Sequence, residues 1–279
     1  MRLASLVVPA ALVVAAGLAI ASPSDEEITT AIATFKKAYA AKDASERTTA
    51  VQQLGAVRHK RVVDELAGPL GRDASPLVRA AAARALGGQW APSAASVLLR
   101  ALAPDDSPRE VTAAVIAALG ENGNEVAVPA LTPLLTLQGK KPASADAPPS
   151  WSHPAIEALK KIGSPKAIDD LLALVTKGGG SSRKKGGGDP IAREAEAALA
   201  TITGQHVSGA AEWRKWWGEN KDSAKEIAVY RSEITGETLE KGPGSKVELP
   251  KGAYLLRTHL EGGGPATGSA SGDKKPRKP

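Results

Sequence analysis

The sequence predicts an all-α protein, a right-handed α-solenoid of helix pairs with a tryptophan-rich capping helix at its C-terminal end. Three observations support this prediction. One helical pattern recurs along the chain. The copies are bounded by residues that favour helix starts and stops. Alanine is abundant in the apolar rows, which lets neighbouring helices approach closely. A compact helical bundle is the alternative, but a bundle does not require such a repeat.

Five copies of the pattern can be aligned on the apolar residue that ends each helix. They are "ERTTAVQQLGAV" (46–57), "SPLVRAAAARALGG" (75–88), "SPREVTAAVIAALGENG" (107–123), "HPAIEALKKIGS" (153–164) and "PIAREAEAALATITG" (190–204). The aligned residues stand 32, 33, 43 and 37 positions apart. The two longer steps contain insertions at 139–150 and 178–188, whose Pro-, Ala- and Gly-rich composition predicts surface loops.

The predicted element boundaries follow from local chemistry. A Ser or Asp that precedes proline predicts a helix start. The side chain accepts a hydrogen bond from a free amide of the first turn, and the amide donor that proline lacks would be unpaired there anyway. This pattern occurs at Ser75, Ser107, Ser164 and Asp189. Glycines able to adopt a left-handed cap predict the stops at Gly55, Gly87, Gly120, Gly163 and Gly204. A second apolar helix follows each copy, for example "RVVDELAGPLG". We therefore expect ten to twelve short antiparallel helices.

The motif "VRAAAARALG" followed by a second helix resembles the HEAT repeat, in the short form called the phycobilisome-lyase HEAT-like repeat. The resemblance covers about 44–204 and implies that repeats occupy 44–207, after an N-terminal capping helix in 22–43.

The family resemblance also implies a ladder of hydrogen bonds between neighbouring repeats, made by a helix-start Asp and an Arg six positions later. Asp73 and Arg79 match this spacing. Asp106 matches in the next copy, but Thr112 stands at the Arg position, and Arg47 aligns in the first copy without its Asp. The fourth and fifth copies lack the pair.

The first 21 residues have an early Arg2, an apolar run and a small-x-small triplet ending at Ala21. This pattern predicts a signal peptide (1–21) and an exported, periplasmic or secreted protein. An uncleaved membrane anchor is the alternative. The chain has no cysteine, so its stability must come from packing without disulfides.

No catalytic, cofactor-binding or metal-binding residue is predicted. The HEAT-like hydroxylases hold two irons with His-Glu pairs, whereas none of His59, His153, His206 and His259 is followed by Glu. We expect these histidines at the surface or at helix caps. Carboxylates that alternate with apolar positions, such as Asp169, are expected on solvated helix faces.

The net charge of +6 does not predict a nucleic-acid partner. The excess positive charge lies in the 183–185 run and in the tail from 262, and the rest of the mature chain is close to neutral. No membrane contact is expected once the signal is cleaved. The tail 262–279 is predicted to be disordered and basic, and 232–261 to form an extended or strapping segment.

The segment "SGAAEWRKWWGENK" contains three of the five tryptophans. It resembles the close of many exported bacterial HEAT-repeat proteins. Trp213, Trp216 and Trp217 share one helix face, which predicts a structural cap in 208–231 packed against Leu199 and Ile202. A stacking platform for a sugar or peptide is the alternative.

Together these observations favour a non-catalytic helical-repeat scaffold that mediates protein–protein interaction in the cell envelope. Its unknown protein partner would bind the groove formed by the "VRAAAARALG"-type helices. An enzyme or enzyme accessory of the HEAT-like lyase or hydroxylase type is the alternative, and it rests on fold analogy.

Overall fold

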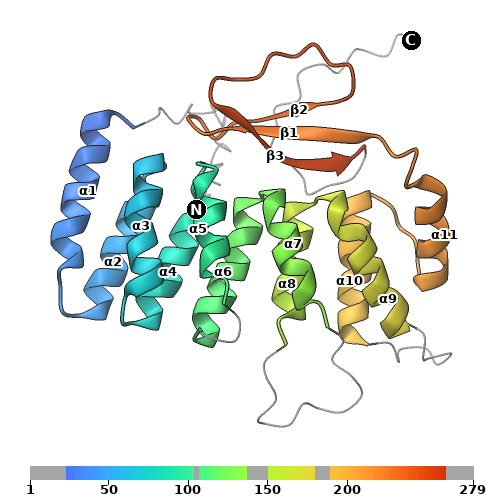
Figure 1. Ribbon diagram of the computed structural model, residues 1–279, viewed down its shortest axis with the longest axis horizontal. Helices are drawn as coiled ribbons and strands as arrows, with labels where there is room; N and C mark the ends of the chain where they lie inside the picture. Colours follow the sequence, from blue (N-terminus) through green and yellow to red (C-terminus); the bar gives the residue numbers. More distant parts are fainter. Residues whose placement is uncertain (1–22, 104–106, 137–149, 180–188, 262–279) are drawn as a thin grey trace, which may run out of the picture.

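The computed structural model describes residues 23–103, 107–136, 150–179 and 189–261. The predicted signal peptide, the predicted tail, Asp106 and nearly all of the two predicted insertions lie outside the described residues. Within the described ranges the helices are stacked side by side from α1 to α11, and three strands cross one edge of the stack (Figure 1). None of these helices is long and apolar enough to cross a membrane.

The described helical part alternates between two rows. The first row contains α1 (Asp25–Tyr39), α3 (Lys60–Arg72), α5 (Ser93–Ala101), α7 (Val128–Leu131) and α9 (Ile168–Gly179). The second contains α2 (Ala44–Gly55), α4 (Pro76–Gly87), α6 (Arg109–Asn122), α8 (Ser152–Ile162) and α10 (Pro190–Thr203), here called the even helices. Short 3₁₀ turns at Glu125–Ala127, Thr132–Leu134 and Pro165–Ala167 complete the connections. Helix α11 (Ala210–Asn220) is the last helix of the stack. The predicted α-solenoid is confirmed in this general form, while its handedness stays a prediction.

The helix starts agree with the predicted caps in part. Asp189 accepts from the Ile191 amide at 2.9 Å and begins α10, and Ser164 accepts from the Lys166 amide at 3.4 Å at the 3₁₀ turn. Ser75 precedes α4 without a side-chain cap bond. Local sequence therefore sets these starts, although the hydroxyl is not always the group that caps.

Three of the five glycines predicted as helix stops have another role. Gly163 and Gly204 end α8 and α10 in the left-handed conformation, as predicted. The other three are helical rather than left-handed: Gly55 and Gly87 are the last residues of α2 and α4, and Gly120 lies two residues before the end of α6. A Cβ on these three would lie 2.6 to 2.9 Å from atoms of the facing alanine on the next even helix. Glycine is needed there because the even helices pack almost backbone to backbone.

The chain is not purely helical, which corrects the all-α prediction. Strands β1 (Glu226–Ser232), β2 (Thr238–Lys241) and β3 (Ala253–Leu260) form an antiparallel sheet of order β2-β1-β3. Strand β1 begins inside the range 208–231 that was predicted for the cap. Only a short turn therefore separates α11 from the sheet. The sequence predicts only an extended or strapping segment over 232–261, because strand pairing depends on partners that are distant in sequence.

The two faces of the sheet are unlike each other. Val229, Arg257 and His259 are buried, with exposed fractions of 0%, 6% and 7%. On the opposite face Tyr230 pairs with Leu239 and with Leu255, and Leu255 is 43% exposed. The buried face is thus partly charged, because it meets the polar ends of helices rather than an apolar layer.

Candidate functional site

The even helices present one continuous surface to solvent. Consecutive even helices pack on one another and on the helices of the other row behind them, so the remaining side of each helix is exposed. We define the even-helix face by the exposed side chains on that side: Thr49, Leu77, Arg84, Ala117, Glu121, His153, Lys161 and Arg193. Close Gly–Ala packing leaves little space between neighbouring helices from α2 to α8, and α10 packs on α8, so the face continues over all five even helices.

An ion pair and a histidine–carboxylate hydrogen bond cross this face. Lys161 on α8 pairs with Glu121 on α6, and His153 Nδ1 lies 2.8 Å from Glu194 Oε2 on α10. Glu194 is another carboxylate that alternates with apolar positions, and its contact with His153 joins two helices. Leu77, by contrast, is 66% exposed in the first turn of α4. Leu77 is the single large apolar side chain among the residues that define this face.

Of the four predicted ladder residues, Arg47, Asp73 and Arg79 lie in the described ranges, and they bond across the boundaries between neighbouring repeats, as the ladder implies. Asp73 binds Arg47 of the preceding repeat through two bonds of 2.9 Å, and it also accepts from the Tyr39 hydroxyl at 2.6 Å. Arg79 does not pair with Asp73 but donates to Ser107 Oγ at 3.2 Å in the following repeat. Each arginine therefore reaches forward to the next repeat.

Electrostatics at this junction follow from the contacts. Hydrogen bonds from Arg47, opposed by burial and assisted by Tyr39, lower the pKa of Asp73 to about 2. Burial, with the adjacent Asp73 carboxylate, raises the pKa of Tyr39 to about 12. Asp73 is thus ionised and Tyr39 neutral at neutral pH, so the phenol remains a donor to the carboxylate. This arrangement suits a structural joint rather than proton transfer.

The three tryptophans of α11 differ in their surroundings. Trp213 is 1% exposed and Trp217 8% exposed, whereas Trp216 is only partly buried between them. Trp217 Nε1 donates to Asp169 Oδ1 at 2.7 Å, and Lys221 Nζ binds the other oxygen at 2.8 Å. Helix α11 packs chiefly on α9, although the predicted partners Leu199 and Ile202 are on α10. Capping itself stays a prediction.

Asp169 was missed as a contact residue. Hydrogen bonds from Lys221 and Trp217, which outweigh burial, lower its pKa, so it is ionised at neutral pH. The alternation of charged and apolar residues around it indicates a solvated helix face correctly for α9 alone. This alternation does not indicate which later helix packs on that face.

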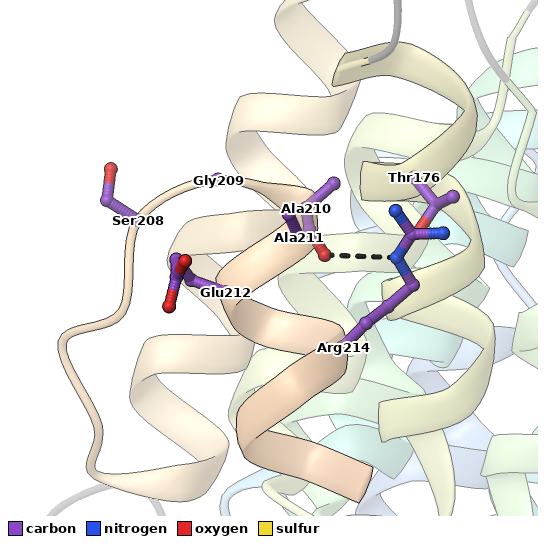
Figure 2. A pocket seen from close by; sticks show the side chains of 7 residues that line it. All are labelled: Thr176, Ser208, Gly209, Ala210, Ala211, Glu212 and Arg214. Carbon is purple, nitrogen blue, oxygen red and sulfur yellow. Dashed lines mark hydrogen bonds between the residues drawn. The ribbon is translucent and has the colours of Figure 1, made fainter.

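A shallow pocket of about 340 Å³ lies where α11 begins beside the end of α9 (Figure 2). Arg214 extends along it and donates from Nε to the Ala210 carbonyl at 3.3 Å. The Gly209 amide on the same loop donates to Glu196 at 2.5 Å. Arg214 and the Gly209 amide are thus already hydrogen-bonded, and no nucleophile with an adjacent base is among the lining residues.

The sheet is fixed to the carbonyl ends of the even helices and of the turn after α4. Arg231 Nη1 donates to the Asn122 carbonyl at 2.8 Å, Arg257 Nη1 lies 3.5 Å from the Lys161 carbonyl, and Tyr254 donates to the Trp90 carbonyl at 2.9 Å. Cations are favoured at helix C-termini because unpaired carbonyls concentrate negative charge there. Burial, with the nearby Arg231, lowers the pKa of Arg257.

Glu125 holds the middle of the seam between sheet and helices. It is 6% exposed and accepts from Lys166 at 2.7 Å, from Ser164 at 3.0 Å and from the Thr258 amide at 2.9 Å. Burial opposes ionisation, but these bonds together lower its pKa. The carboxylate therefore joins two repeats and strand β3.

The histidines do not converge on a metal site. His59 caps α3 by accepting from the Arg61 amide at 3.1 Å, and His153 and His206 are exposed, as predicted. His259 is instead buried in the sheet, with Nδ1 2.9 Å from the Leu260 carbonyl. Over the described ranges, no three His, Cys, Asp or Glu residues are grouped as metal ligands would be.

The fold and surface described above define the protein as a helical-repeat protein. Residues 32–115 and 69–147 match the family model of HEAT repeats. The matched part of the chain, 32–147, therefore consists of HEAT repeats.

Among solved structures, the chain resembles one described as the complex of CpcE and CpcF of phycocyanin lyase from Nostoc sp. PCC7120, with 24% sequence identity and a TM-score of 0.47. The likeness covers 64% of this chain and 65% of that chain, slightly less than two thirds of the latter. No curated protein matches.

Proposed function

We propose that the chain is a non-catalytic scaffold of the cell envelope that binds another protein through the even-helix face. The observation that carries this proposal is the continuity of that face over five repeats, with the exposed Leu77 among partly neutralised charges. Extended faces of stacked repeats are the surfaces through which solenoids bind partners. The apolar run and cleavage pattern of the first 21 residues support export.

The test captures partners from envelope extract with the mature chain and compares two variants. Leu77→Ser removes the large apolar side chain of the even-helix face, whereas Val126→Ser removes a 53% exposed apolar side chain outside that face. We expect a protein that is retained by the parent and by Val126→Ser and is lost with Leu77→Ser. Equal retention by all three chains, or no retained protein, contradicts the proposal.

Two further measurements address the enzymatic alternative and the location. Metal analysis and visible absorbance of the purified chain should show neither stoichiometric iron nor a bound pigment, and finding either would overturn the non-catalytic assignment. Fractionation of cells that express the full chain should recover it outside the cytosol, shortened to begin at Ser22. A full-length cytosolic product would contradict the envelope location.

A further inference from the structure

A second site, separate from the even-helix face, lies near the N-terminal end of the stack of helices. A cavity of about 410 Å³ is enclosed by the start of α1, the turn into α3 and the turn between β1 and β2. Its apolar wall includes Ile28 and Ala91, which are 1% and 3% exposed. We call it the N-terminal cavity. Its size is in the range of small-ligand sites.

Three cationic side chains line this cavity: Arg58, Lys60 and Arg61. None of the three forms an ion pair within the described part of the chain, although many other lysines there do, including Lys36, Lys160, Lys161, Lys166 and Lys221. Asp25 and Glu233 also line the cavity but lie beyond 4.0 Å of these cations. The positive charge of the cavity wall is therefore not neutralised by a direct contact.

Neutral partners hold the two arginines in place. Arg58 Nε donates to the Gly88 carbonyl at 3.1 Å, and its guanidinium lies 5.0 Å from the centre of the Trp90 ring. Arg61 Nη1 donates to Thr29 Oγ1 at 3.2 Å. Each contact uses one of five guanidinium donors, so others remain for a ligand.

Trp90 is itself fixed by the sheet. Tyr254 donates to its carbonyl at 2.9 Å, and Gly236 packs so closely on the indole that a Cβ there would lie 2.2 Å from the ring. An arginine stacked on a fixed aromatic ring keeps its orientation without losing its charge. Pre-organised donors bind more strongly than freely rotating ones because less entropy is lost on binding.

We infer that the N-terminal cavity binds an oxyanion, a carboxylate or phosphate group carried by a ligand. Arg58, Lys60 and Arg61 supply charge-assisted hydrogen bonds, and Ile28 and Ala91 contact the apolar part of the ligand. The carboxylates of Asp25 and Glu233 repel an anionic group on their side of the cavity. The site therefore admits ligands whose anionic group lies beside the three cationic side chains. This site does not depend on the proposed scaffold function.

The test measures calorimetric binding of two probes to the mature chain, inorganic phosphate and an acetylated hexaglutamate peptide. The variant Lys60→Gln/Arg61→Gln is compared with Arg214→Gln/Lys215→Gln, which removes the same charge from exposed side chains of α11 at the other end of the stack. We expect at least one probe to bind the parent and the control alike, and about tenfold more weakly to the cavity variant. Whichever probe binds assigns the source of the oxyanion.

A second variant should change the binding affinity in the opposite direction. Glu233→Gln removes negative charge from the cavity and should tighten binding of the same probe about threefold or more. Thermal unfolding by circular dichroism shows that each variant is folded. No binding of either probe, an equal loss in the α11 control, or weaker binding by Glu233→Gln would overturn the inference. None of these results would alter the dependence of partner capture on Leu77.

Discussion

Arg47 and Asp73 form a two-point ion pair across the boundary between the first two repeats. Arg47 Nε and Nη2 lie 2.9 Å from the two carboxylate oxygens, and the side chains are only 15% and 4% exposed. Arg47 also donates to the carbonyls of Ala41 and Lys42, so it ties a loop, a helix and the next repeat together. Such a buried joint is costly to break because each partner would be left unpaired.

Replacing Asp73 with Asn should therefore lower the free energy of unfolding by about 2 kcal/mol at pH 7. The folded-state pKa is lowered to about 2 from the ordinary 3.8, so this stabilisation is present above about pH 4 and is lost as the pH falls toward 2. Urea unfolding at pH 7 and pH 2.5 measures it, and the difference between parent and variant should shrink at the lower pH. Asp170→Asn, on the exposed side of α9, should change stability by less than about 0.5 kcal/mol at both pH values.

Adding a methyl group should have opposite effects at two helical glycines. In Gly87→Ala the new Cβ would lie 2.9 Å from the Cα of Ala118, so α4 and α6 must separate, which should cost about 1 to 3 kcal/mol. In Gly71→Ala nothing lies within 4 Å, and the higher helix propensity should stabilise by about 0.5 kcal/mol. Thermal unfolding distinguishes them, and a more stable Gly87→Ala would contradict the close-packing explanation.

Truncation of Trp213 tests the predicted cap. Because the ring is 1% exposed, Trp213→Ala should cost about 3 to 5 kcal/mol, and hydrogen exchange should accelerate first in α9 and α10 and little in α2 and α4. The alternative platform would instead leave stability unchanged and reduce only ligand affinity. A variant that melts like the parent would reject the cap.

Glu125→Gln should loosen the sheet. The variant keeps the size of the side chain but loses the charge that attracts Lys166. We expect faster hydrogen exchange in β3, beginning near Thr258, with little change in α2. Because the pKa of Glu125 is lowered, the parent should show the same loosening only as the pH falls below about 4.5, the ordinary value for the group. Unchanged exchange in β3 would show that Arg231 and Arg257 hold the sheet without Glu125.

Much of the helical organisation was predictable because its signals are local. The repeat spacing, the capping Asp189 and the stops at Gly163 and Gly204 depend on residues within one or two turns of each other. The same local reasoning placed the ends of α2 and α4 correctly at Gly55 and Gly87, but it missed that these glycines and Gly120 are helical and contact the next helix. A glycine that ends a helix and one that admits a neighbouring helix are indistinguishable without the neighbour.

For the candidate sites, the sequence shows which residues are charged but not which of them come together. The basic residues 58–61 are plain in the sequence, but the cavity they line exists because the turn between β1 and β2 comes back to them from more than 170 positions away. The long-range partner of Asp169 was equally out of reach, since 48 residues separate it from Trp217.

The sequence by itself thus determined that this protein is a stack of short helices, because periodicity and helix capping act over a few residues. Tertiary structure alone decided that Asp73 meets Arg47 rather than Arg79, that a charged sheet face covers helix carbonyl ends, and that Arg58 is held against Trp90. Such contacts are selected by geometric fit and charge compensation between distant segments, and these become defined only when the repeats have packed together.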